Sequence, residues 1–155
     1  VHSNSGITNK ILYLVVQGDI HYDIQVDPLN QNINISRNIA SDIWFNWNRY
    51  YLDAEDDFSI GREKMLQVAI DLYPDNPLIY QTLCNAWASV GIGTPLMSGD
   101  VNSDSIVNVQ DIIIIIGFIL DTLIPTEDQL FIGDMNFDGI IDVLDIVVII
   151  NIIFG

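Results

Sequence analysis

The chain has 155 residues, with 21 acidic residues against five lysines and arginines and a formal net charge of −16. This length suffices for one modest domain and a small module, and the charge argues against nucleic acid or an anionic membrane as a partner. A single cysteine, Cys84, excludes an internal disulfide and a cysteine metal cluster, and its apolar surroundings predict a buried packing residue.

The first 98 residues have the pattern of a helical domain. Residues 7–16 are mostly apolar and predict a buried helix that ends before Gly18. Ser36 is expected to cap a second helix, because apolar residues then recur at steps of three and four. One face of that helix is predicted to consist of Ile39, Ile43, Trp47 and Tyr50.

Two further helices are expected before a linker. Ser59 is placed to cap the third, which turns Leu66, Ala69, Ile70 and Tyr73 inward. The fourth is expected to begin with Asn76 as cap and Pro77 as first residue, and to close at Gly91. Residues 93–98 then form the linker, so the predicted division is 1–92, 93–98 and 99–155.

The last third carries one oxygen pattern twice, 34 residues apart. Side-chain oxygens recur at loop positions 1, 3, 5, 9 and 12, with a backbone carbonyl at position 7, which is the cage that calcium takes at about 2.3–2.6 Å. Surface turns without metal are the alternative, but two copies in phase, each followed by an apolar run, favour two Ca²⁺ sites. The predicted ligands are Asp100, Asn102, Asp104, Ile106, Asn108 and Asp111, and Asp134, Asn136, Asp138, Ile140, Asp142 and Asp145.

The two loops differ from a regulatory EF-hand pair. Position 12 is aspartate rather than glutamate, and no charged amphipathic helix leads into either loop. Apolar residues at positions 7 and 8 suit a short paired segment between the loops, and Asp111 and Asp145 are expected to start the helices that follow. These apolar runs are much shorter than the roughly 18–20 residues that span a bilayer, so no membrane span is predicted.

Residues 99–155 resemble a dockerin, in which a calcium loop and one helix are duplicated. The resemblance implies a secreted chain that docks onto a cohesin-like protein. Loop positions 10 and 11, where many dockerins place small hydroxyl residues, read Val109-Gln110 and Val143-Leu144. Val109, Val143 and Leu144 are therefore candidate docking residues, and burial against the helical domain is the alternative.

A second resemblance starts at the first residue. The segment V-H-S-N-S-G-I-T-N-K is similar to the V-H-x-N-S-G-I-x-N-K segment of thermolysin-like neutral metallopeptidases, and the match continues over residues 1–92. It implies the helical half of a zinc protease whose active cleft lies between this half and a zinc-binding half. The resemblance implies that His2 stabilises the negatively charged oxygen that forms when zinc-bound water attacks the peptide carbonyl. His21 resembles a family position that is structural.

The zinc site itself is missing from this sequence. The family takes its ligands from H-E-x-x-H and a later glutamate, and neither occurs here. We therefore expect Zn²⁺ to be held by an upstream part of a longer protein, and the present chain to be inactive alone.

Taken together, these patterns predict a mainly α protein with two parts. The favoured interpretation is the C-terminal part of a secreted, extracellular zinc endopeptidase that hydrolyses protein or peptide substrates and carries a calcium-dependent attachment module. The alternative is a non-catalytic, calcium-dependent binding module beside a remnant helical domain. An upstream H-E-x-x-H motif distinguishes the two.

Overall fold

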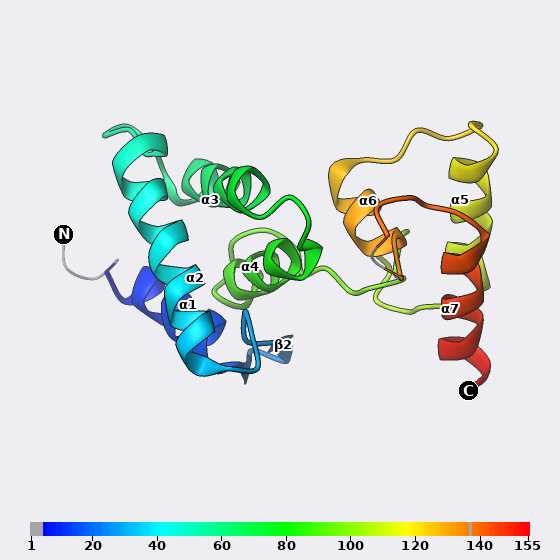
Figure 1. Cartoon of the computed structure of the whole chain (residues 1–155), viewed down its shortest axis with the longest axis horizontal. Helices are drawn as coiled ribbons and strands as arrows, with labels where there is room; N and C mark the ends of the chain where they lie inside the picture. Colours follow the sequence, from blue (N-terminus) through cyan, green and yellow to red (C-terminus); the bar gives the residue numbers. More distant parts are fainter. Residues whose placement is uncertain (1–4, 137) are drawn as a thin grey trace. The chain divides into compact units, whose positions relative to one another are not determined.

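A computed structural model describes residues 5–136 and 138–155. Within these ranges the protein is mainly α, as predicted, with seven α-helices, one π-helical turn and one two-stranded sheet (Figure 1). The chain divides into two compact units, Val1–Pro95 and Leu96–Gly155. No helix in the described part is long and apolar enough to cross a membrane.

Unit one begins with helix α1, Ser5–Gln17, followed by a β-hairpin. Apolar residues at steps of three and one place Ile11, Leu14 and Val15 on the buried face of α1, which confirms the predicted first helix. Strand β1, Asp19–His21, pairs antiparallel with β2, Ile24–Val26.

Helix α2 spans Ile33–Asn46, and its cap differs from the prediction. The side chain of Asn32, rather than Ser36, accepts the hydrogen bond from the Asn34 N–H, at 3.0 Å. Ser36 lies buried inside the helix, where its hydroxyl donates to the Asn30 carbonyl at 2.7 Å. An Asx cap nearer the start thus satisfies the first helical N–H groups, and Ser36 ties the helix to the preceding loop instead.

A π-helical turn, η1, Trp47–Tyr51, extends α2. Its closing bond runs from the Leu52 N–H to the Trp47 carbonyl at 3.0 Å, five residues back. The wider turn rotates later side chains off the α-helical face, so Tyr50 is 67% exposed although we expected it beside Trp47. Trp47 itself is buried, and its indole N–H donates to the Gly61 carbonyl at 2.8 Å.

Helix α3 spans Phe58–Leu72, and its cap also differs from the prediction. Asp57 accepts from the Ile60 N–H at 3.0 Å, whereas Ser59 is an exposed first-turn residue. A carboxylate at this position also suits the positive end of the helix dipole. The inward residues are buried at Leu66 and Ala69 and half-buried at Ile70 and Tyr73.

Helix α4, Pro77–Ser89, completes the core of unit one. It begins after Asn76 with Pro77 at the first turn, as predicted, although the Asn76 side chain makes no cap hydrogen bond. Gly91 follows its end with a positive φ of 86°. Cys84 is fully buried on this helix, and so is Trp87, whose indole N–H donates to the Met65 sulfur at 3.3 Å.

Unit two contains three helices: α5 over Val109–Ile119, α6 over Glu127–Gly133 and α7 over Val143–Phe154. Helices α5 and α7 begin two residues before Asp111 and Asp145, which we expected to start them. The described residues of this unit form no strand where we expected a paired segment between the loops. Side chains from that segment pack against the apolar cluster of the unit instead. The buried members of the cluster are Val101, Ile115, Phe118 and Ile149, and Val107 and Ile141 pack against them.

Candidate metal centres

The first acidic loop is closed by hydrogen bonds from backbone N–H groups to its own carboxylates. Asp100 accepts from the Asp104 N–H at 3.0 Å and the Ser105 N–H at 2.8 Å. Asp111 reaches back from helix α5 and accepts from the Asn102 N–H at 3.1 Å and the Asn108 N–H at 2.8 Å. These bonds join the two ends of the loop.

The second loop repeats these bonds 34 residues later. Asp134 accepts from the Asp138 N–H at 3.2 Å and the Gly139 N–H at 2.8 Å. Asp145 accepts from the Asn136 N–H at 3.2 Å and the Asp142 N–H at 2.8 Å. The sequence repeat is therefore also a repeat of local structure, which a set of unrelated surface turns does not produce.

The remaining predicted ligands occupy equivalent positions in both loops. The Ile106 N–H donates to Asp104 at 2.9 Å, and the Ile140 N–H donates to Asp138 at 3.0 Å. These bonds hold the two isoleucines on the loop while their side chains stay 61% and 64% exposed. Only their backbone carbonyls can serve a cation, as the sequence pattern requires.

Asn108 and Asp142 at loop position 9 also cap the helices that follow. The Asn108 side chain accepts from the Gln110 N–H at 2.7 Å, and Asp142 accepts from the Leu144 N–H at 2.7 Å. Together with the carboxylate three residues later, each forms a capping box. The same residues therefore start the helix and terminate the loop.

Burial of negative charge is the strongest electrostatic feature of unit two. Asp111 and Asp145 have no exposed surface, and Asp100 and Asp134 are 5% and 8% exposed. The unit contains no lysine or arginine, and in the described ranges the salt bridges join Lys64 to acids of unit one. Because a buried charge is costly unless it is paired, a cation at each loop suits these carboxylates.

The donor set decides which cation fits. In the part of the chain that the structure describes, no three histidine, cysteine, aspartate or glutamate side chains form a group that could hold a metal ion. Aspartate and glutamate are among these residue types, so the carboxylates of neither loop form such a group among the described residues. Calcium takes oxygens from side-chain amides, backbone carbonyls and water as well as from carboxylates. The loops contain all three kinds of protein oxygen, which are the donor types that a hard cation of calcium size takes.

The turn at loop position 6 distinguishes the two loops. Ser105 has a φ of 69° and Gly139 a φ of 84°, both in the left-handed region. Glycine adopts this region freely, whereas serine meets a steric penalty there. Loop one is therefore the more strained of the two.

One bond holds the start of loop one to helix α6. The Gln129 side chain donates to the Val101 carbonyl at 3.0 Å. Sequence reasoning did not identify this positioning residue, although Thr126-x-x-Gln129 has the spacing of a capping box, which the structure forms.

The structure describes one of the two histidines, His21. His2 lies outside the described residues. His21 is at the end of β1, where its Nδ1 lies 2.8 Å from the Ser89 carbonyl oxygen on α4. This bond fastens the hairpin to α4 and gives His21 a structural role.

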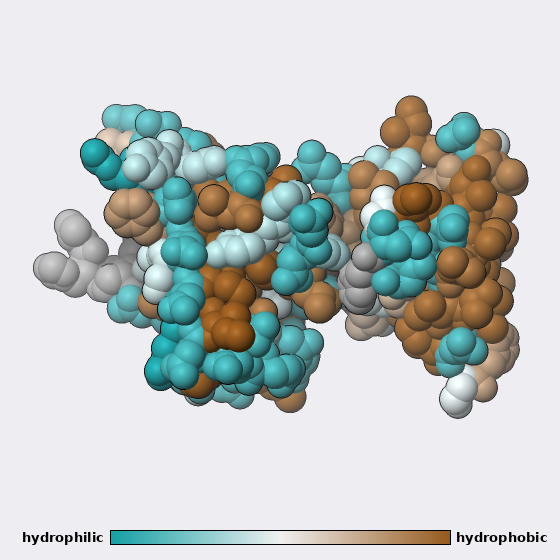
Figure 2. Space-filling view, in the orientation of Figure 1, coloured by the Kyte–Doolittle hydropathy of each residue, from teal (hydrophilic) through white to brown (hydrophobic). Residues whose placement is uncertain are grey.

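The candidate docking residues are exposed. Val109, Val143 and Leu144 have 52%, 61% and 54% of their surface accessible. Figure 2 shows a broad apolar surface over α5 and α7 that contrasts with the mixed surface of unit one. Further exposed apolar residues on these helices are Ile113, Ile116, Val147, Ile150, Ile152 and Phe154.

Each of the two units is similar to a known protein family. Residues 1–92 match the family described as thermolysin metallopeptidase, alpha-helical domain, and residues 98–154 match the dockerin type I domain. Over 92 residues the chain is 33% identical to neutral protease B of Bacillus subtilis and 35% identical to thermostable neutral protease NprT of Geobacillus stearothermophilus. Each alignment covers 59% of this chain and 16% of the relative.

A transglutaminase-activating metalloprotease of Streptomyces mobaraensis is 28% identical over 106 residues, which cover 64% of this chain and 14% of that protein. The chain thus spans about a sixth of the length of the curated relatives it matches.

Proposed function

Because the chain belongs to the thermolysin metallopeptidase family through its helical unit and carries a dockerin type I domain, we propose that it is part of a secreted, calcium-anchored zinc endopeptidase. The observation that carries the proposal is the pairing of these two units on one chain. A peptidase half-domain supplies one wall of a cleft, and the duplicated loops supply an attachment module.

Calcium is the cation we assign to the loops. In loop one Asp100, Asn102, Asp104, Asn108 and Asp111 would hold it with the Ile106 carbonyl. In loop two the ligands would be Asp134, Asn136, Asp138, Asp142 and Asp145 with the Ile140 carbonyl. Bound calcium neutralises the crowded carboxylates and joins each loop to its following helix, so it should stabilise the fold of unit two.

The attachment partner is proposed to be a cohesin-like protein. Dockerin domains bind cohesin partners, and the exposed apolar residues Val109, Val143 and Leu144 provide a surface that association can bury. Charged groups are sparse at the centre of protein interfaces, so an apolar patch with acids in the neighbouring loops suits docking. An extracellular location follows from the same assignment.

Catalysis is proposed for a longer protein that includes this chain. In that protein His2 would donate a hydrogen bond to the carbonyl oxygen of the scissile peptide as negative charge develops there. The 155 residues contain no H-E-x-x-H motif, and His21 is hydrogen-bonded to the Ser89 carbonyl. The zinc ligands are therefore assigned to another part of the protein.

Expression of the encoded protein with its upstream sequence tests this proposal. We expect an H-E-x-x-H motif upstream and hydrolysis of casein that stops when o-phenanthroline removes zinc. The matched sample is the present 155-residue chain, which should not cleave casein. An upstream sequence without the motif, together with an inactive longer protein, would support a non-catalytic binding module instead.

A further inference from the structure

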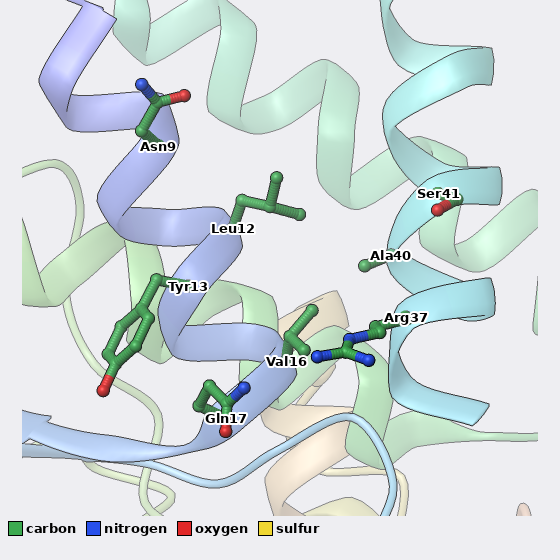
Figure 3. A pocket seen from close by; sticks show the side chains of 8 residues that line it. All are labelled: Asn9, Leu12, Tyr13, Val16, Gln17, Arg37, Ala40 and Ser41. Carbon is green, nitrogen blue, oxygen red and sulfur yellow. The ribbon is translucent and has the colours of Figure 1, made fainter. Parts of the chain in front are cut away.

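A groove on unit one lies between helices α1 and α2. Its volume is about 550 Å³, which is in the range of pockets that hold small ligands. Figure 3 shows Leu12 and Val16 of α1 facing Ala40 and Arg37 of α2 across it.

The groove has one charged lining residue, Arg37, in a protein that is otherwise strongly acidic. Helices α1 and α2 contain two of the chain's five lysines and arginines, Lys10 and Arg37, and one acid, Asp42. The Asp42 carboxylate accepts a hydrogen bond from Tyr73 at 3.2 Å, so it is engaged with unit one outside the groove. Lys10 lies 4.8 Å from the ring centre of Tyr13, which lines the groove.

Arg37 is the group best placed to bind a ligand. No acid lines the groove, and among the described residues Arg37 forms no salt bridge. In Figure 3 its guanidinium reaches from α2 toward Val16 on α1. A guanidinium presents two parallel N–H groups that match the two oxygens of a carboxylate.

The rest of the lining defines the body of the ligand. Leu12, Val16 and Ala40 supply an apolar floor, which favours aliphatic groups. The side-chain amides of Asn9 and Gln17 each offer an NH2 group as donor and a carbonyl oxygen as acceptor to a peptide group. A fatty acid has the carboxylate and the aliphatic body but no peptide group for these amides.

We propose that this groove binds the free C-terminal carboxylate of a peptide that ends in aliphatic residues. Arg37 would hold the carboxylate, the apolar floor the last side chain, and Asn9 or Gln17 the last peptide group. The inference deepens the proposed function, because an endopeptidase releases peptides with free C-termini. It rests on this chain's own residues, so its test requires no peptidase activity.

Binding is measured with the 155-residue chain and a fluorescent tetrapeptide that ends in two leucines, by fluorescence anisotropy. The matched probe is the same peptide with a C-terminal amide in place of the acid. We expect the acid to bind at least about tenfold more tightly, which is the scale of hydrogen bonds to a charged group. Arg37→Gln should remove that preference, while Arg49→Gln, which changes an arginine outside the groove, should preserve it.

Two further measurements identify the class of ligand and the location of the binding site. Decanoate should compete more weakly than the peptide acid, and Leu12→Asn should weaken the peptide acid and amide alike. Equal binding of acid and amide, tighter binding of decanoate, or equal losses from Arg37→Gln and Arg49→Gln would overturn the proposal. Circular dichroism of each variant verifies that the helices remain folded.

Discussion

The two candidate calcium loops differ in backbone strain at loop position 6, and this difference leads to a testable prediction. Ser105 holds a φ of 69°, whereas its counterpart Gly139 holds 84°. A non-glycine residue in the left-handed region costs roughly 1–2 kcal/mol, and glycine gives back about 0.4–1 kcal/mol as extra freedom of the unfolded chain. Ser105→Gly should therefore stabilise the folded loop by a net free energy between about 0 and 1.6 kcal/mol, with about 0.5–1 kcal/mol as the middle of that range.

The gain should appear as tighter calcium binding in loop one, by about two- to fivefold, if calcium orders the loop. If the loop keeps its structure without calcium, the same free energy should appear as greater stability toward urea. Gly139→Ser is the reciprocal change, and a Cβ at position 139 meets no atom within 4 Å. It should weaken loop two by a similar amount through the backbone alone.

Isothermal titration calorimetry and urea unfolding of the two variants test this reasoning. Ser105→Ala is the control, since it removes the hydroxyl and keeps the restricted backbone. An equal gain from Ser105→Ala, or no change in either measurement for Ser105→Gly, would show that backbone strain does not limit loop one.

Three other predictions concern the surface, the oxyanion donor and acid stability. Changing Val143 and Leu144 to Asp should abolish capture of the docking partner in a pull-down and leave calcium affinity near wild type; lost calcium binding would make them structural residues. In the active longer protein, His2→Ala should lower kcat by about 10²–10³ and leave KM and zinc content little changed, and full activity would refute its role. Hydrogen bonds from the Asp53 backbone and Lys64 lower the pKa of Asp56 below the usual value of an aspartate. The stabilising contribution of Asp56 is therefore present above that usual pKa and is lost as the pH falls through the lower pKa of the folded state. Asp56→Asn should therefore lose less stability than the wild type between pH 5 and 2 in thermal melts. An equal loss of stability in the variant and the wild type over this pH range would contradict the prediction.

Local sequence signals predicted most helices but not all their caps. Pro77 after Asn76 identified the start of α4, because proline fits the first turn of a helix. Ser36 and Ser59 failed because Asn32 and Asp57, a few residues earlier, cap the helices through their side chains.

Features that depend on contacts between distant residues were harder to predict. The π-helical turn Trp47–Tyr51 contains one more residue per hydrogen-bonded turn than an α-helix. The spacing of apolar residues in the sequence does not reveal this extra residue, so the exposure of Tyr50 was not predicted. The hairpin turn at Tyr22 and Asp23 has positive φ at both residues without the usual glycine, and His21 is fastened to Ser89, 68 positions away.

The candidate calcium loops were more accessible from sequence, because their hydrogen bonds are local. Asp100 and Asp111 lie 11 positions apart and bond backbone groups within the same loop, so fixed spacing alone carries the information. The groove at Arg37 has no such signal, since it is made by side chains from two separate helices.

Calorimetric titration of the EDTA-treated 155-residue chain with calcium tests the central claim most directly. We predict two calcium ions per chain, with the tighter site in loop two, which contains four carboxylates against three in loop one. Asp134→Ala should remove the tighter site, whereas Asp121→Ala, outside both loops, should leave both intact. Absence of calcium uptake, or equal effects of these two substitutions, would contradict the assignment of the loops.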